Sequence, residues 1–370
     1  MKRILLGTTA LAAISLASLP AVAGPVTASD SFDLSLGLEF RQRLDFTSQD
    51  QTTGAGRGYS MAADKGELKV RGKKKGDNGL EYGFQIELNT LTSDGLASDE
   101  SWMYVEGDWG RVEMGDQDSA NDRILVEATD ISAGRAGVDG DIGDIWASGL
   151  DLANVNSQTS DDPKITYFTP RFSGFQLGAS LTPDTGAAGF TRDADNDGDF
   201  ENVIGLAAGY SGTFSGVKVN VTGMYEFGES EIDSSVGGGG AGGTNENDLE
   251  MWGFGATVEY AGFGLGGGWV DLGKSGVLTT AVTDAGEWWN LGASYGTGPW
   301  KVSSSYYESR RKIAATVTRR DQVVAFDGQY VVAPGWTTMA ALYLVDSTNF
   351  NVAGADNDGH IVLFSNQFSF

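Results

Sequence analysis

The amino-acid sequence predicts an all-β fold, a transmembrane antiparallel β-barrel of about sixteen strands. Apolar and polar residues alternate along many short segments, so each strand would have one face in an apolar medium and the other in water. Tight turns alternate with long polar loops between these segments, which gathers the long loops at one end of a barrel. Tryptophan and tyrosine recur near the predicted strand ends, as in the aromatic girdles of membrane barrels.

The first strand is predicted from an alternation that starts at Phe32. Large apolar side chains occupy every second position from Phe32 to Phe40. The positions between them include the charged residues Asp33 and Glu39, and Arg41 continues this polar face. This period of two is the signature of a strand. The same reasoning predicts strands near residues 32–46, 65–75, 79–90, 101–108, 110–116, 164–171, 175–182, 201–211, 216–227, 248–260, 263–272, 287–296, 299–309, 318–331, 335–345 and 360–370.

The connections between these segments fall into two kinds. Short ones carry turn signals such as Ser215-Gly216, Ala261-Gly262 and Pro334-Gly335. Long ones are polar and rich in Gly or Asp, and they cover residues 47–64, 91–100, 117–163, 183–200, 228–247, 273–286 and 346–359. This alternation of short and long connections favours an even number of strands in an outer-membrane barrel.

The last ten residues, IVLFSNQFSF, fit the same fold. A closed sheet must pair its last strand with its first, so this stretch is expected to be a membrane strand. Phe364, Phe368 and Phe370 would then face lipid or the rim of the barrel. A soluble β-sandwich also alternates, but about sixteen strands would make it unusually large, and it has no need of aromatic residues at strand ends.

The first residues and the composition indicate export. Met1 to Arg3 form a basic head, an apolar stretch follows to Leu19, and Ala21-Val22-Ala23 is a small-x-small cleavage site. We therefore expect residues 1–23 to be a cleaved signal peptide and residues 24–370 to form one barrel domain. The chain has no cysteine, so no disulfides are expected, and its net charge of -25 argues against binding nucleic acid.

Three stretches resemble one known family. VEGDWGRVEMGDQDS (105–119) is similar to the strand pair that leads into the long third loop of the Gram-negative general porins, in particular those of the alphaproteobacterial branch. KITYFTPRFSGFQLGASL (164–181) resembles the hairpin after that loop, and LKVRGKKKGDNGLEYGFQIEL (68–88) resembles the second hairpin. The resemblance covers essentially the whole mature chain, and its specificity comes from the order and spacing of these stretches together.

The resemblance implies a sixteen-stranded homotrimeric channel in the outer membrane, passing small hydrophilic solutes by diffusion. It also implies that a third loop, here residues 117–162, folds into the lumen and constricts it. Phe370 would be the terminal aromatic residue read by the barrel-assembly machinery, and outer-membrane lipid and lipopolysaccharide would surround the barrel. No cofactor is expected to be required.

Ion selectivity in such a pore would come from charged side chains around the constriction. The loop supplies the acids Asp116, Asp118, Asp122, Glu127, Asp130, Asp139, Asp141, Asp144 and Asp151. The alternation places on the lumen face the bases Arg41, Arg43, Lys69, Arg71, Lys73 and Arg111. A basic wall would thus oppose an acidic loop, and the net negative charge predicts a preference for cations.

The stretch RDADNDGDF (192–200) resembles a calcium loop in its alternating acids Asp193, Asp195, Asp197 and Asp199. An EF-hand is excluded, because Ile204 stands at the twelfth position and a strand follows instead of a helix. The open alternatives are an extracellular loop that binds Ca²⁺ and a solvated acidic loop.

The sequence also bears on two other functions. A barrel enzyme is disfavoured, because His360 is the one histidine and the chain has neither a cysteine nor a GxSxG motif. A substrate-specific channel remains the alternative to a general one. Only Trp288, Tyr307 and Tyr343 have lumen parity among the large aromatic residues, which is too few for the aromatic ladder of a sugar channel.

Overall fold

The computed structural model describes residues 32–50, 58–91, 97–134, 142, 145–147, 149–186, 199–231, 246–350 and 354–370. The predicted signal peptide, residues 1–23, lies outside these ranges. No helix among the described residues is long and apolar enough to cross a membrane. The two helical elements they contain are a single helical turn and a shorter 3-10 turn, α1 (Ala120–Ile124) and η2 (Thr129–Ile131).

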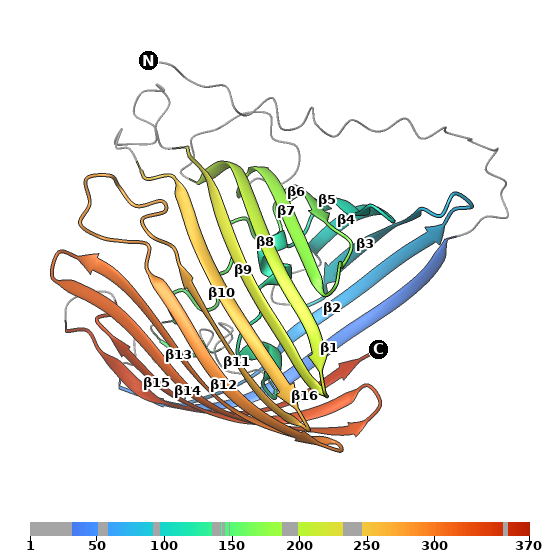
Figure 1. The fold of residues 1–370 in the computed structure, drawn as a ribbon. Helices are drawn as coiled ribbons and strands as arrows, with labels where there is room; N and C mark the ends of the chain where they lie inside the picture. The colour runs from blue at the N-terminus through green and yellow to red at the C-terminus, as the bar shows by residue number, and fades with distance from the viewer. Residues whose placement is uncertain are drawn as a thin grey trace, which may run out of the picture.

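Sixteen antiparallel strands form one closed barrel, in which each strand pairs with its neighbours in sequence and β1 pairs with β16 (Figure 1). The predicted fold class is confirmed, and each predicted segment overlaps one strand, although several strands, such as β2 and β13, extend beyond the predicted bounds. The strands are β1 (Asp33–Gln49), β2 (Tyr59–Lys75), β3 (Glu81–Asn89), β4 (Ala97–Gly107), β5 (Gly110–Asp116), β6 (Pro163–Phe168), β7 (Phe175–Asp184), β8 (Phe200–Phe214), β9 (Val217–Ser230), β10 (Leu249–Tyr260), β11 (Phe263–Asp271), β12 (Glu287–Thr297), β13 (Trp300–Ala314), β14 (Val317–Ala333), β15 (Trp336–Thr348) and β16 (Asn357–Ser369).

The end of the chain closes the barrel, as the alternation in its last ten residues predicts. Phe40 lies opposite Phe368 in the β1–β16 register. Beyond β16, the N–H of Phe370 donates to the carbonyl of Leu38 at 3.0 Å, and the N–H of Leu38 donates to the carbonyl of Phe370 at 2.8 Å. Phe370 therefore pairs with β1, while its side chain stays 80% exposed on the outer rim.

The strands have an apolar outer face and a largely polar inner face. On β10, Trp252 and Phe254 are exposed, whereas Met251 and Thr257 on the opposite face are buried. Outward aromatic side chains meet across strands at two levels. Near the long loops, the ring centres of Trp252 and Trp269 lie 4.6 Å apart; beside the short turns, those of Trp300 and Tyr330 lie 4.4 Å apart. These two levels correspond to the two aromatic girdles of a membrane barrel.

Two short connections show how sequence fixes the hairpins. At 215–216 and at 261–262 both central residues have positive φ: 50° at Ser215 and 87° at Gly216, then 50° at Ala261 and 87° at Gly262. This is the type I′ geometry that matches the twist of a two-residue hairpin, and glycine adopts it at no steric cost. The connection between β13 and β14 is equally short, although it lies at the end of the barrel where most loops are long.

Candidate functional site

Residues 117–134, 142, 145–147 and 149–162, which we call the inner segment, pack against the inner faces of many strands. Ser119 caps α1 by accepting from the N–H of Asp122, and the N–H of Ala120 donates to Ser180 Oγ on β7 at 2.7 Å. Asn121 Nδ2 donates to Glu226 Oε2 on β9 at 2.7 Å. Glu226 is fully buried and also accepts from the N–H of Gln158 at 2.8 Å, so one carboxylate holds both ends of the inner segment.

Glycines on the inner faces of β7, β8 and β10–β12 let the inner segment lie close to the sheet. A Cβ at Gly255 would stand 1.7 Å from the carbonyl oxygen of Val126, and one at Gly266 would stand 2.9 Å from Ile131 Cγ1. A Cβ at Gly178 would meet Ile124 Cδ1 at 2.8 Å. Part of the glycine content therefore serves this close approach instead of turns.

The second half of the inner segment is held by β12–β16. Trp146 Nε1 donates to Ser347 Oγ at 3.2 Å, and Trp288 Nε1 donates to the carbonyl of Val155 at 2.7 Å. Tyr307 donates its hydroxyl hydrogen to the carbonyl of Asp151 at 2.9 Å. The three aromatic residues predicted on the lumen face have that orientation, but Trp288, Tyr307 and Tyr343 are buried in an apolar core with Ile142 and Trp146, and so form no exposed ladder. This core joins the inner segment to the barrel wall.

The hydrogen bonds of the described part of the inner segment are unevenly distributed around the barrel. Among the described residues, its hydrogen bonds reach β1, β5–β7, β9, β12–β15 and the ends of their loops, but not β2 or β3. The predicted basic residues Lys69, Arg71 and Lys73 lie on β2, and Arg41 and Arg43 lie on the adjoining β1, on the face opposite the exposed apolar side chains.

Several of these bases on β1 and β2 are paired with carboxylates that have no part in the predicted constriction. Arg41 Nε lies 3.2 Å from Asp64 Oδ1, Arg43 Nε lies 2.8 Å from Asp45 Oδ2, and Lys69 Nζ lies 2.7 Å from Glu87 Oε2. Four cations, counting Lys65, thus meet four carboxylates, Asp45, Asp64, Glu67 and Glu87. These four cations are therefore paired with acids, while Arg71 and Lys73 on β2 have no carboxylate partner among the described residues.

The other three predicted bases differ in their partners. Arg71 Nε donates to Gln85 Oε1 at 2.5 Å, whereas Lys73 makes no ion pair with the residues described. Arg111 donates to Glu113, and its guanidinium lies 3.7 Å from the ring centre of Tyr104. Glu113 is fully buried and also accepts from Arg123 of the inner segment. Sequence spacing gives no signal for Glu113 or Arg123, because they meet only through the fold.

The predicted acids are spread along the inner segment. Asp116 ends β5, and Glu127 accepts from Asn290 on β12. Asp130, in η2, accepts from the N–H of Glu127 at 2.6 Å. Asp139, Asp141 and Asp144 lie outside the described residues.

One cluster of acids stands where the inner segment begins and ends. Carboxylate oxygens of Asp118, Asp161 and Glu100 lie within 4.8 Å of one another. Burial, followed by the charge of Asp122, raises the pKa of Asp118 to about 7. Burial, with the charges of Asp118 and Glu100 after it, likewise raises the pKa of Asp161 to about 7. Both groups therefore titrate near neutral pH.

Asp151, another predicted acid of the inner segment, pairs with two arginines that sequence reasoning missed. Arg311 Nε on β13 lies 2.8 Å from Asp151 Oδ2, and Arg319 Nε on β14 lies 3.8 Å from the same atom. Arg319 also bonds to Asp321 at 2.9 Å and to the carbonyl of Gly149 at 2.9 Å. Ion pairs therefore also join the inner segment to β13 and β14.

The calcium prediction falls mostly outside the described residues, which exclude Asp193, Asp195 and Asp197. Asp199 is described, and one of its carboxylate oxygens lies within 4.8 Å of carboxylate oxygens of Asp184 and Glu231. These three residues come from the facing ends of β7, β8 and β9. Neither Asp184 nor Glu231 belongs to the predicted motif.

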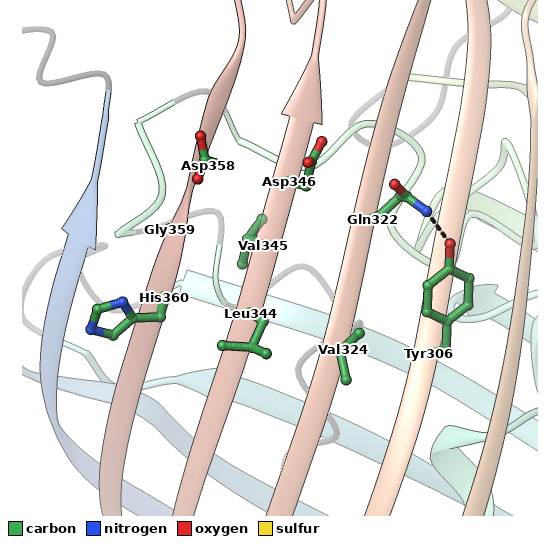
Figure 2. Close-up of a pocket in the computed structure, with 9 residues that line it drawn as sticks. All are labelled: Tyr306, Gln322, Val324, Leu344, Val345, Asp346, Asp358, Gly359 and His360. Atoms are coloured by element: carbon green, nitrogen blue, oxygen red, sulfur yellow. Dashed lines mark hydrogen bonds between the residues drawn. The ribbon is translucent and has the colours of Figure 1, made fainter.

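His360 lines a groove of about 450 Å³ on β13–β16 (Figure 2). The lining combines Val324 and Leu344 with Tyr306, Gln322, Asp346 and Asp358, and it contains no Ser, Thr or Cys. The imidazole points toward β1, away from the two carboxylates at the upper end of the groove (Figure 2). The groove therefore brings no nucleophile and base together.

Comparison with known proteins agrees with this architecture. An uncharacterized protein of Rickettsia prowazekii is 26% identical over 209 residues, 50% of this chain and 43% of the relative. A second, from Rickettsia bellii, is 22% identical over 293 residues, 61% of this chain and 66% of the relative. The chain thus spans less than two thirds of the length of these curated relatives.

Solved structures show the same fold. An anion-selective porin from Comamonas acidovorans superposes with a TM-score of 0.66 at 15% identity, over 92% of this chain and 100% of its own. A mutant of the Rh. blastica porin gives 0.58 at 17% identity, over 91% and 100%. A family model described as Gram-negative porin matches residues 8–349. The chain therefore belongs to the Gram-negative porin family, whose barrels lie in the outer membrane.

Proposed function

We propose that this porin is a channel for passive diffusion of small hydrophilic solutes and ions, with the inner segment as its constriction. The observation that carries the proposal is the one-sided packing of the inner segment. Among the described residues, its hydrogen bonds reach much of the inner wall but not β2 or β3, where Arg71 is exposed and Lys69 half-buried. A water-filled passage would run between that wall and the acids of the inner segment.

A preference for cations is the second part of the proposal. Arg41, Arg43, Lys65 and Lys69 are each paired with a carboxylate, which weakens the positive field of the wall formed by β1 and β2. Asp118, Asp122, Asp161 and Asp162 on the inner segment exceed the nearby cations Arg123 and Lys164 in number. Their summed field would raise the local concentration of cations. The anion-selective relative supports the fold alone at 15% identity, so it sets no expectation for selectivity here.

A homotrimer is supported by the low part of the barrel wall that the short strands β5 and β6 form, which we call the low wall. β5 has seven residues and β6 has six, whereas a strand that spans a membrane needs about 9–11. The outer face here is still apolar, with Met114 on β5 exposed by 52% and Met103 on the adjoining β4 exposed by 63%. A second copy of the chain would cover this low wall, and a Vibrio cholerae relative of the same fold is described in a trimer form.

Crosslinking tests the interface between copies, since the chain has no cysteine of its own. Met114→Cys should crosslink between copies with a short bis-maleimide and give a covalent dimer, the largest product that one cysteine per chain allows. Leu265→Cys is the matched control, because Leu265 is similarly exposed but lies on the opposite wall, in β11. Equal crosslinking of both variants would contradict an interface at the low wall.

Liposome swelling tests the channel itself. Vesicles that contain the refolded chain should swell in solutions of arabinose, more slowly in glucose and least in raffinose, because an unspecific constriction sorts solutes by size. Uptake of one sugar irrespective of size would point to the substrate-specific alternative. Vesicles that do not swell in any solute would contradict an open channel. An enzymatic function is not proposed, since His360 faces outward without a nucleophile beside it.

Calcium binding is a separate proposal, favoured by the meeting of Asp199, Asp184 and Glu231 within 4.8 Å. Hard carboxylate oxygens at such spacing suit Ca²⁺. Titration calorimetry with Ca²⁺ should give heat for the native chain and less for Asp199→Ala. Equal heats for the native chain and the variant would show that Asp199 is not a ligand. No heat in either would contradict calcium binding.

A further inference from the structure

Lys164 is the second residue of β6, and its side chain is buried on the inner face at the base of the inner segment. It is 3% exposed and lies opposite Gly115 of β5 in the register. Lysine is almost never fully buried unless its charge is compensated, because the ammonium loses its hydration. The compensation found here is unusual.

The ammonium is surrounded by backbone carbonyls. Nζ donates to the carbonyl of Asp162 at 2.6 Å, to that of Ser160 at 2.7 Å and to that of Gln117, while the carbonyl of Thr159 lies at 3.4 Å. Three N–H donors thus meet the four oxygens. Among the residues described, no carboxylate forms an ion pair with Lys164.

These carbonyls belong to the two ends of the inner segment. Gln117 is its first residue, and Thr159, Ser160 and Asp162 are among its last. One side chain therefore ties the exit from β5 to the return into β6. Ser160 has φ of +37°, in the left-handed region that non-glycine residues rarely adopt, and its carbonyl is one of those held by Lys164.

The hydrogen bonds of Lys164 lie next to the residues of the inner segment that would shape the pore. Ser119, two residues after Gln117, caps α1, and Gln158, one residue before Thr159, donates to the buried Glu226. Asp118 and Asp161 of the acid cluster are each adjacent in sequence to a residue that contributes a carbonyl. A shift of either end would move these acids.

We propose that Lys164 is a positioning residue that clasps both ends of the inner segment and so fixes the width and steadiness of the pore. The inference rests on the proposed channel function. Lys164 does not touch the permeating solute. It acts through the backbone of the inner segment, whose placement would otherwise depend on contacts farther along.

Single-channel recording tests the clasp with the full-length mature chain. Lys164→Met keeps the length and apolar stem of the side chain but removes all three donors. The expected result is a folded barrel whose current moves between several levels, whereas the native channel holds one level. Limited trypsin digestion should cut the variant after Arg123 faster than the native chain. Lys164→Arg, which keeps charge and donors, should restore much of the steady level.

Lys218→Met is the matched control, because it also removes an inner-face ammonium, but one whose partner is Glu259 of β10 at 2.9 Å. It should keep a single conductance level. Folding is monitored by the faster migration of the unheated barrel in a denaturing gel. If Lys164→Met does not fold, Lys164→Gln, which keeps two donors, takes its place with the same expected instability.

Suppose that the native channel conducts. A Lys164→Met variant with one steady conductance level and native trypsin resistance would then overturn the clasp. A native chain that does not conduct would contradict the proposed function instead. In that case, native trypsin resistance of the Met variant would still overturn the clasp, and faster cleavage would support it. The two failures are therefore distinguishable.

Discussion

Replacing Gly255 with alanine should displace the inner segment. The added Cβ would stand 1.7 Å from the carbonyl oxygen of Val126, and side chains essentially never approach closer than 3.0 Å, so one of the two must move by 3.0 − 1.7 = 1.3 Å. Gly255 lies in a strand that is bonded on both sides, to β9 and β11. The inner segment is therefore the part expected to yield.

That displacement has a calculable cost. The N–H of Val126 donates to Thr222 Oγ1 at 3.0 Å, and a movement of 1.3 Å would break this bond. Overpacking costs about 1–3 kcal/mol. Losing the hydrogen bond adds about 1 kcal/mol. The docking of residues near 126 should thus weaken by about 2–4 kcal/mol, and the barrel should still close because its ladder bonds are untouched.

The assay is single-channel conductance combined with trypsin digestion at Arg123. Gly255→Ala should change the conductance and speed the cleavage, whereas the control Gly223→Ala should change neither, since its Cβ would meet nothing closer than 3.7 Å. Native conductance and native trypsin resistance in Gly255→Ala would refute the reasoning, because they would mean that Val126 does not lie on that glycine.

Three further predictions concern charges inside the barrel. The preference for cations should rise as pH is raised through about 7, where Asp118 and Asp161 lose their protons, and Asp118→Asn should flatten this dependence. Arg319→Met should lower the free energy of unfolding by about 3–5 kcal/mol in a denaturant titration, because the fully buried Asp321 loses its ion pair; an unchanged midpoint would contradict this. Glu226→Ala should speed trypsin cleavage of the inner segment more than Glu226→Gln, which preserves the shape; equal effects would contradict a bonding role.

The strands were predictable because their pattern is local. Alternation needs only neighbouring residues, and hairpins such as Ser215-Gly216 carry their own backbone preference. The same alternation placed Arg41, Arg43 and Lys69 on the inner face. The alternation could not predict the carboxylate partners of these bases. Asp64 lies at the register shift between Arg41 and Gln42, where the period of two is broken.

The contacts of the inner segment were beyond sequence reasoning for a different reason. Asp151 meets Arg319 across 168 residues, and Trp146 meets Ser347 across 201, so no spacing rule connects them. Glycine in a strand indicates weak packing or close approach without saying what approaches. Gly255 is explained only when Val126 is placed against it.

The most direct test of the central claim is the reversal potential of single channels in a planar bilayer under a KCl gradient. We predict stepwise openings and a potential with the sign that shows K⁺ more permeant than Cl⁻, increasing in magnitude from pH 6 to pH 8 as Asp118 and Asp161 ionise. A potential that favours Cl⁻, or a bilayer that shows no openings, would contradict the account.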